Sequence, residues 1–192
     1  METILTLNDI IQMTQRDGES WAVAHAKRLL ELIRQIGQDL PYDSDALQLA
    51  AYLHDWGAFD CYAQKGVDHA LRSRQVAETQ ILPYMDLGTE VKNIILEAIE
   101  LHDYRDKRTP QSNEALLLRE ADMLEFLGVI GMARDFARGP RDVAACTRRI
   151  LGRRADIQDR FTLRGAQEIA RVRLEHMQQC LQWLEEESYG IL

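Results

Sequence analysis

Apolar residues recur every three to four positions over most of the 192-residue chain, and no segment alternates with the period of two that marks a β-strand. Glycine, proline and short polar runs interrupt this pattern and divide it into helices. The expected helices cover residues 4–15, 21–36, 45–55, 69–82, 91–102 and 113–127. The last of these continues, bent near Gly128 or Gly131, to Arg138. One more helix runs from Gly139-Pro140 to about Leu151, and a final long one reaches about Glu187. The chain is therefore predicted to be all-α.

Capping residues support these boundaries, because Ser, Thr and Asp side chains accept hydrogen bonds from the first backbone amides of a helix. The predicted N-caps are Ser20, Asp68, Thr89, Ser112 and Thr162. No repeat, low-complexity run or long linker divides the chain. We expect one domain over residues 1–192, a helical bundle whose motif-bearing core spans about 20–140, with C-terminal helices at about 140–187 packing on it.

Composition and charge narrow the classes of function. The formal net charge of −8 argues against binding nucleic acid, which depends on neutralising phosphates, but it leaves small phosphorylated ligands open. No apolar run approaches the roughly 20 residues of a membrane span, and the N-terminus has no basic region typical of a signal peptide. The three cysteines are scattered and lack CxxC spacing, which indicates free thiols. We therefore expect a cytoplasmic protein that does not bind membranes.

The stretch LAAYLHDWGAFD, residues 49–60, joins an apolar helix face directly to His54 and Asp55. Neighbouring residues on a straight helix point about 100° apart, so their side chains converge only at a helix end or kink, which Gly57 allows. A buried imidazole and carboxylate cost free energy unless something pairs them, and a divalent metal ion is the simplest partner. The alternative is a helix end with an ordinary His and Asp.

Further histidines extend this motif into a possible metal centre. His25, His69 and His102 lie on or at the ends of predicted helices, and Asp122 lies in the middle of the apolar run LLLREADMLEFLG. A carboxylate placed there is expensive to bury unpaired. Imidazole and carboxylate ligands suit Mn, Fe, Co, Ni or Zn, and the absence of a neighbouring Cys disfavours a structural zinc site. Taken singly, each His also fits a hydrogen-bonded core residue, and Asp103 fits a cap or a solvated residue.

Several segments together resemble one protein family. They are HAKRL from His25, AAYLHDWG at 50–57, DHALRSRQVAETQIL at 68–82, IILEAIELHD at 94–103 and READMLEFLGVIGMARDF at 119–136. Their order and approximate spacing resemble a small bacterial branch of the HD-domain superfamily of metal-dependent phosphohydrolases. The resemblance implies an HD-type helical fold, metal ligation by His25, His54, Asp55 and Asp122, and a second ion or substrate contact at His69 and His102.

The resemblance also implies an activity, the hydrolysis of a small phosphorylated substrate, with a nucleotide favoured. One or two divalent ions (Mn, Fe, Co, Ni, Zn or Mg) would activate a water molecule that attacks phosphorus, and Asp55 is best placed to orient that water. Developing charge on the phosphoryl oxygens needs donors. Arg28, one helical turn after His25, is the first candidate, and weaker candidates are Lys65, Arg72 and Arg105.

Two other functions compete with this one. Some members of the superfamily use the same order of ligands to hold two irons and oxidise a substrate with O₂. A signalling module that binds metal or nucleotide without turnover is the other, although the complete set of ligands argues against it. The last helix carries Leu174, Met177, Leu181 and Leu184 on one face, which could pack on the core or form a homodimer.

Overall fold

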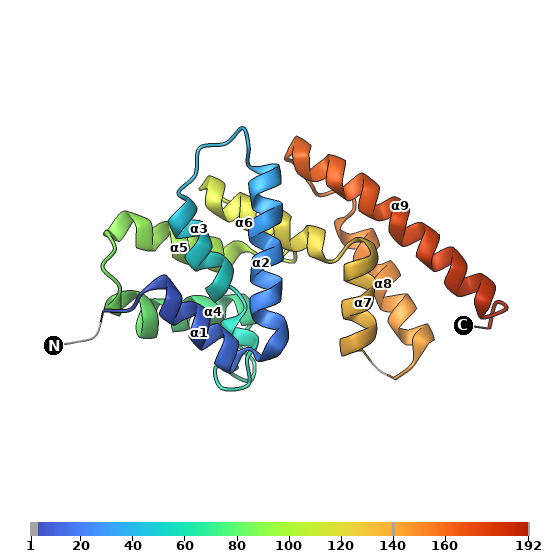
Figure 1. The fold of residues 1–192 in the computed structure, drawn as a ribbon, viewed down its shortest axis with the longest axis horizontal. Coiled ribbons are helices and arrows are strands. Elements are labelled where there is room, and N and C mark those ends of the chain that lie inside the picture. The colour runs from blue at the N-terminus through green and yellow to red at the C-terminus, as the bar shows by residue number, and fades with distance from the viewer. Residues whose placement is uncertain (1–3, 140, 192) are drawn as a thin grey trace. The chain divides into compact units, whose positions relative to one another are not determined.

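The computed structural model describes residues 4–139 and 141–191, apart from the side chains of Glu19 and Ser20. Over these residues the chain folds into nine α-helices, with short 3-10 and π turns between α3 and α5, and without a β-strand (Figure 1). The predicted all-α fold is confirmed. The chain forms two compact units, of which the first ends at Ala121 and the second begins at Asp122. The expectation of one domain over the whole chain stays a prediction.

The first unit carries most of the sequence motifs. Its helices are α1 (Leu7–Asp17), α2 (Glu19–Ile36), α3 (Ser44–Leu53), α4 (His69–Val76), α5 (Thr89–Leu101) and the larger part of α6 (Asn113–Glu125), with the short turns η1 (Trp56–Ala58), η2 (Ala77–Ile81) and η3 (Leu82–Tyr84). Helix α3 packs against α1, α2 and α5, and α4 packs against α5 and η1. These contacts make α3 the central helix of the unit.

Helix α3 brings the HD motif to a buried position. Asp43 begins the helix by accepting hydrogen bonds from the amides of Asp45 and Ala46 at 2.9 and 3.0 Å. Nearly every residue from Ala46 to Leu53 is buried, as expected for a helix surrounded by others. The helix ends at Leu53 with His54 as its C-cap, two residues earlier than predicted. The chain then turns at Asp55 into η1, so the motif lies at a buried helix end.

Two predicted caps are confirmed. Asp68 accepts a hydrogen bond from the amide of Ala70 at 2.9 Å at the start of α4. Ser112 accepts one from the amide of Ala115 at 3.2 Å at the start of α6. Both side chains therefore satisfy backbone donors that a helix leaves open at its first turn.

Three predicted caps are wrong. Helix α5 begins at Thr89 itself, with Gly88 in the extended conformation of an N-cap, and α9 begins at Arg164 after Leu163. Helix α2 begins at Glu19 with Gly18 as N-cap, so Ser20 lies inside the helix, and its side chain lies outside the described part. In each case the backbone enters the helix one or two residues away from the polar residue, which a sequence pattern places only approximately.

Helix ends also differ from the predictions. The segment expected as one helix to Leu82 leaves the α-helix at Val76 and continues as η2 and η3, where Pro83 cannot donate a backbone hydrogen bond. The segment expected to bend near Gly128 instead breaks after Glu125. Gly128 has φ of +73°, a conformation that glycine adopts at little cost, and it starts a separate helix.

The second unit contains the end of α6 followed by α7 (Gly128–Arg138), α8 (Val143–Ile157) and α9 (Arg164–Glu187). Helix α7 packs against both α8 and α9. Helix α8 extends past the predicted end near Leu151, and Pro140, expected to start it, lies outside the described residues. Among the described residues, none of the helices combines the length and apolarity needed to cross a membrane.

A buried hydrogen bond links α1 to the turn that follows the HD motif. The indole Nε1 of the fully buried Trp56 donates to Oγ1 of Thr14 at 3.0 Å, and that hydroxyl donates to the carbonyl of Ile10 at 2.8 Å.

Replacing Thr14 by Val keeps the volume of the side chain but removes the acceptor for Trp56. We therefore expect the unfolding free energy to fall by about 1–3 kcal/mol in chemical denaturation. The matched change Thr79→Val, at an exposed hydroxyl bonded to the carbonyl of Gln75, should cost less than about 0.5 kcal/mol. Equal losses in the two variants would contradict this account of the Trp56 bond.

Candidate metal centre

His54 and His102 are held in the same way at the ends of two packed helices. Each is the C-cap of its helix, α3 or α5, and each ring donates from Nδ1 to a carbonyl three residues earlier: Ala51 at 2.8 Å and Ile99 at 2.7 Å. A carbonyl oxygen only accepts, so the Nδ1 proton is fixed on each ring. The Nε2 lone pair of each ring therefore remains for a further interaction. This outer-shell carbonyl is the usual companion of a metal-ligating histidine.

Asp55 lies between four imidazole rings and uses both of its oxygens. Oδ2 is 3.9 Å from Nε2 of His25 and 3.5 Å from Nε2 of His54. Oδ1 is 3.6 Å from Nε2 of His69 and 3.8 Å from Nε2 of His102. Of the three groups of described residues placed to hold a cation, two share Asp55, each with two imidazoles and one oxygen of its carboxylate, and the third is Asp68, His69 and Asp103.

These distances are compatible with coordination. Ligand atoms bound about 2.1 Å from one ion lie about 3.0–3.5 Å apart, so small side-chain rotations would bring either group of donors onto a cation. Four neutral nitrogens and a bridging carboxylate form the donor set expected for a divalent transition metal. The residues therefore fit the metal that the sequence pattern implies.

The charge of Asp55 suits this role. Burial raises the pKa of its carboxyl, but the surrounding imidazoles, with His54 the strongest and then His25 and His102, lower the pKa well below its usual range. Asp55 is therefore a carboxylate at neutral pH. It supplies the negative charge that a divalent cation needs in a site whose other donors are imidazole nitrogens.

The remaining two histidines reach the centre from α2 and α4. His25 is 1% exposed and its ring lies 5.2 Å from that of His54 between centroids. His69 is the first residue of α4, and its side chain is 26% exposed. Its Nε2 lies 3.2 Å from Nε2 of His102. The structure thus brings together the four histidines and Asp55 that the sequence predicted as one site.

A close backbone contact sets the distance between Asp55 and His69. Gly57, two residues after Asp55, donates its amide to Oγ of the fully buried Ser73 at 2.8 Å. A Cβ on Gly57 would lie 2.2 Å from the carbonyl oxygen of His69, so only glycine permits this approach. From the sequence, Ser73 is expected to be a small packing residue that lets helices approach the site, and its burial against Gly57 agrees with that; the hydrogen bond to the Gly57 amide comes only from the fold.

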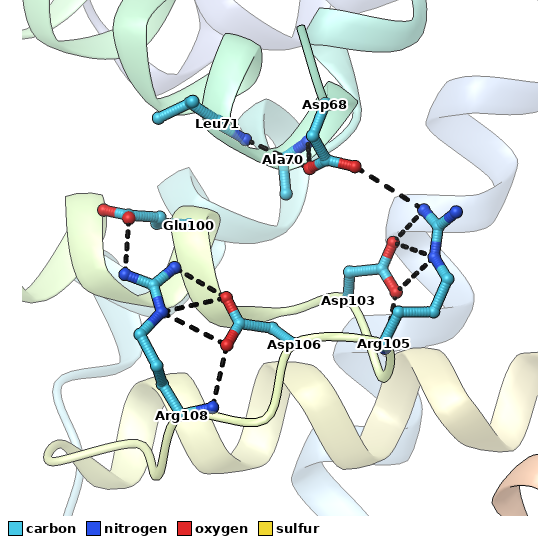
Figure 2. A pocket seen from close by; sticks show the side chains of 8 residues that line it. All are labelled: Asp68, Ala70, Leu71, Glu100, Asp103, Arg105, Asp106 and Arg108. Atoms are coloured by element: carbon cyan, nitrogen blue, oxygen red, sulfur yellow. Dashed lines mark hydrogen bonds and ion pairs between the residues drawn. The ribbon is translucent and has the colours of Figure 1, made fainter.

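An outer layer of charged residues lies beside His69, and Figure 2 shows its members Asp68, Asp103 and Arg105. Asp103 accepts hydrogen bonds from Nε and Nη2 of Arg105 and, at 2.8 Å, from its amide, and its Oδ2 lies 3.7 Å from Nε2 of His69. Burial raises the pKa of Asp103, but Arg105 outweighs it and holds the pKa below the usual range. Asp103 thus holds a turn of the loop after α5, whose C-cap is His102, and it is buried, so it is neither a helix cap nor a solvated residue. Its closeness to His69 could not be predicted from the sequence pattern, because it depends on the packing of α4 against α5.

This layer forms one wall of a cavity of about 410 Å³. The cavity is lined by Asp68, Ala70, Leu71, Glu100, Asp103, Arg105, Asp106 and Arg108. Figure 2 shows two Arg–Asp pairs facing each other across it: Arg105 with Asp103, and Arg108 with Asp106. Arg105 also approaches Asp68 at 3.7 Å, which places its guanidinium at the edge of the candidate metal centre.

The other predicted site residues occupy varied positions. Arg28 is half-buried on α2, one turn after His25, and Lys65 is exposed in the loop before α4. Arg72 donates from Nε to the carbonyl of Tyr62 at 2.7 Å, so its guanidinium helps to hold that loop. Asp122 is buried on α6 and is the first residue of the second unit. Its place among the ligands, like the roles of the arginines, stays a prediction.

The sequence places the chain in a known family. A model of the HD domain matches residues 22–127, so the chain belongs to the HD domain family, as predicted. It is similar to the uncharacterized protein YpgQ of Bacillus subtilis (strain 168), with 25% identity over 201 residues that cover 99% of this chain and 94% of YpgQ.

Solved structures share the fold. The crystal structure of Bacillus subtilis YpgQ in complex with ADP superposes with a TM-score of 0.73 and 22% identity, covering 97% of this chain and 100% of YpgQ. A predicted HD superfamily hydrolase from an uncultured Thermotogales bacterium superposes with a TM-score of 0.66 and 24% identity, covering 94% of this chain and 90% of that one.

Proposed function

We propose that the protein is a metal-dependent phosphohydrolase that acts on a small phosphorylated substrate, with a nucleotide as the favoured class. The observation that carries this proposal is the position of Asp55, whose two oxygens face two pairs of imidazoles at 3.5–3.9 Å. Such a bridging carboxylate between two groups of nitrogen donors is typical of two-ion sites that hydrolyse phosphate esters.

We assign His25, His54 and Asp55, with Asp122 as a fourth ligand, to the first ion, and His69, His102 and Asp55 to the second. A divalent ion there supplies Lewis acidity, which makes a nearby water more acidic and polarises a phosphoryl oxygen. Asp55 remains anionic, so it can accept a hydrogen bond from the attacking water and orient it. The carbonyls of Ala51 and Ile99 keep two of the rings in the tautomer that this arrangement needs.

Arginines would bind the phosphate. Arg105 is the best placed, because its side chain is 62% exposed and its Nη2 lies 3.5 Å from Nδ1 of His69. Arg28 follows, on the same face of α2 as His25. Arg72 and Lys65 are weaker candidates, since one is engaged with Tyr62 and the other is exposed in a loop. The preference for a nucleotide draws support from the complex of the similar protein YpgQ with ADP.

Removing the metal should abolish the activity. We expect the purified protein to release phosphate or pyrophosphate from some members of a panel of nucleoside mono-, di- and triphosphates and simple phosphomonoesters, each assayed with Mn²⁺, Mg²⁺, Co²⁺ and Ni²⁺. Dialysis against a chelator should lower the rate by at least about 100-fold, and returning the metal should restore it. A rate that survives chelation, or no release from any substrate with any metal, would contradict the proposal.

A di-iron oxygenase is the second candidate, because four imidazoles and a bridging carboxylate also suit iron. Anaerobic loading with Fe²⁺ followed by exposure to O₂ separates the two functions. An oxygenase should consume O₂ and give a mixed-valent di-iron signal in electron paramagnetic resonance. We expect no mixed-valent signal, and O₂ consumption much slower than phosphate release.

A further inference from the structure

The Nδ1 atom of His69 faces two charged groups of opposite sign. Oδ2 of Asp68 lies 3.6 Å from it, and Nη2 of Arg105 lies 3.5 Å from it. The corresponding atoms of His54 and His102 each face one backbone carbonyl. The proton on His69 is therefore not fixed by the helix, as it is on the other two rings, but depends on which charged neighbour prevails.

The contact between His69 and His102 indicates one position for the proton on the His69 ring. Because Nδ1 of a neutral His102 donates to Ile99, its Nε2 carries a lone pair and accepts. The 3.2 Å contact between the two Nε2 atoms then requires His69 to donate from Nε2. Nδ1 of His69 becomes an acceptor, which matches the guanidinium of Arg105. A chain of hydrogen bonds thus runs from Arg105 through His69 and His102 to Ile99.

Coordination of a cation requires the other tautomer. If His69 and His102 are both to bind through Nε2, both Nε2 atoms must present lone pairs, and the proton of His69 must lie on Nδ1. Asp68 is the neighbour that can accept this proton in a hydrogen bond. Its Oδ1 is already engaged with the amides of Ala70 and Leu71 at the start of α4. Its Oδ2 lies 3.6 Å from Nδ1 of His69 and 3.7 Å from Nη2 of Arg105, and Figure 2 shows the second of these contacts.

We propose that Asp68 is a positioning residue that selects the metal-binding tautomer of His69, and that Arg105 opposes it by favouring the tautomer that hydrogen-bonds to His102. The inference rests on the proposed metal-dependent function and deepens it. It makes the cation affinity of the His69–His102 position depend on the tautomer of His69. Movement of Arg105 toward a substrate phosphate would weaken its hold on Nδ1, so substrate and second ion would favour each other's binding.

The variant Asp68→Asn tests this proposal, because asparagine still caps the helix but offers no negative charge to Nδ1. Titration calorimetry with Mn²⁺ alone should show two binding steps in the wild-type protein. We expect the weaker step to lose about 10–100-fold in affinity in Asp68→Asn, the usual effect of an outer-shell change, with the tighter step unchanged. Arg105→Gln should shift the weaker step in the opposite direction by several-fold.

Two control variants separate this role from capping and from charge alone. Asp43→Asn changes a cap with the same kind of backbone hydrogen bonds, at the end of α3 away from His54, and should leave both steps unchanged. Asp106→Asn removes a carboxylate from the same cavity, where it pairs with Arg108, and should alter the weaker step by less than about three-fold. A loss in Asp106→Asn equal to that in Asp68→Asn would indicate a general charge effect and overturn the proposal.

The tautomer itself gives a readout independent of affinity. In protein labelled with ¹⁵N-histidine and loaded with Zn²⁺, two-bond ¹H–¹⁵N spectra should show His69 protonated on Nδ1 in the wild type and lose that signal in Asp68→Asn. A single binding step in the wild type, an unchanged weaker step in Asp68→Asn or a Zn²⁺-loaded His69 protonated on Nε2 would overturn the inference and leave the proposed hydrolase intact. Failure of the wild type to bind any metal would contradict the proposed function as well.

Discussion

Replacing Asp55 by Ala should lower kcat/KM for the substrate found in the panel by about 1,000-fold or more while leaving the helical fold intact. The change removes the carboxylate shared by both groups of imidazoles and the acceptor proposed to orient the attacking water. We expect far-ultraviolet circular dichroism to match the wild type. Calorimetry with Mn²⁺ should show both binding steps greatly weakened, because each position loses its only negative ligand within the first unit.

Asp86→Ala is the matched control. Asp86 is an exposed aspartate in the segment before α5, so its removal should change kcat/KM by less than about two-fold. An Asp55→Ala protein that turns over substrate at the wild-type rate would contradict both the site and the mechanism. A loss of helical content in Asp55→Ala would instead call for Asp55→Asn, which keeps the shape of the side chain and should lose activity by the same order.

Gly57→Ala should be the most damaging single-methyl change in the first unit. The added Cβ would lie 2.2 Å from the carbonyl oxygen of His69 and 2.6 Å from the amide nitrogen of Ser73, so η1 and α4 must move apart. Overpacking of this kind costs about 1–3 kcal/mol of unfolding free energy. The shift also separates Asp55 from His69, so we expect weaker binding of the second ion together with the loss of stability in chemical denaturation.

Gly152→Ala is a control that should change the unfolding free energy in the opposite direction. Gly152 lies inside α8, and a Cβ there would meet no atom within 4 Å. Alanine is a better helix former than glycine, so this variant should be more stable by up to about 1 kcal/mol and should bind Mn²⁺ as the wild type does. If Gly57→Ala were as stable as the wild type and bound both ions, the close contact between η1 and α4 would not matter for the centre.

The helices were predictable because each buries one apolar face, and that face leaves a period in the sequence. Their ends were harder. Asp68 and Ser112 were correctly recognised as caps, since their side chains bind the first amides, whereas α5 begins after Gly88 and not after Thr89. The break before Gly128 depends on a positive φ, which the sequence allows but does not require.

The candidate site was predictable to the extent that its residues stand out against apolar surroundings. His54 and Asp55 interrupt the buried face of α3, and His102 does the same at the end of α5. Asp68 and Ser73 could not be recognised in this way, because a helix cap and a small buried residue are common features with ordinary structural explanations. Their relation to His69 depends on contacts across the fold, which only the three-dimensional arrangement supplies.

The central claim is that the imidazoles around Asp55 hold divalent cations. The most direct test is an anomalous difference map from a crystal of the wild-type protein grown or soaked with Mn²⁺. We predict two peaks on either side of the Asp55 carboxylate, one about 2.0–2.3 Å from Nε2 of His25 and His54 and the other at a similar distance from Nε2 of His69 and His102. A map without a peak beside Asp55, or with Mn²⁺ bound only elsewhere on the molecule, would contradict the account.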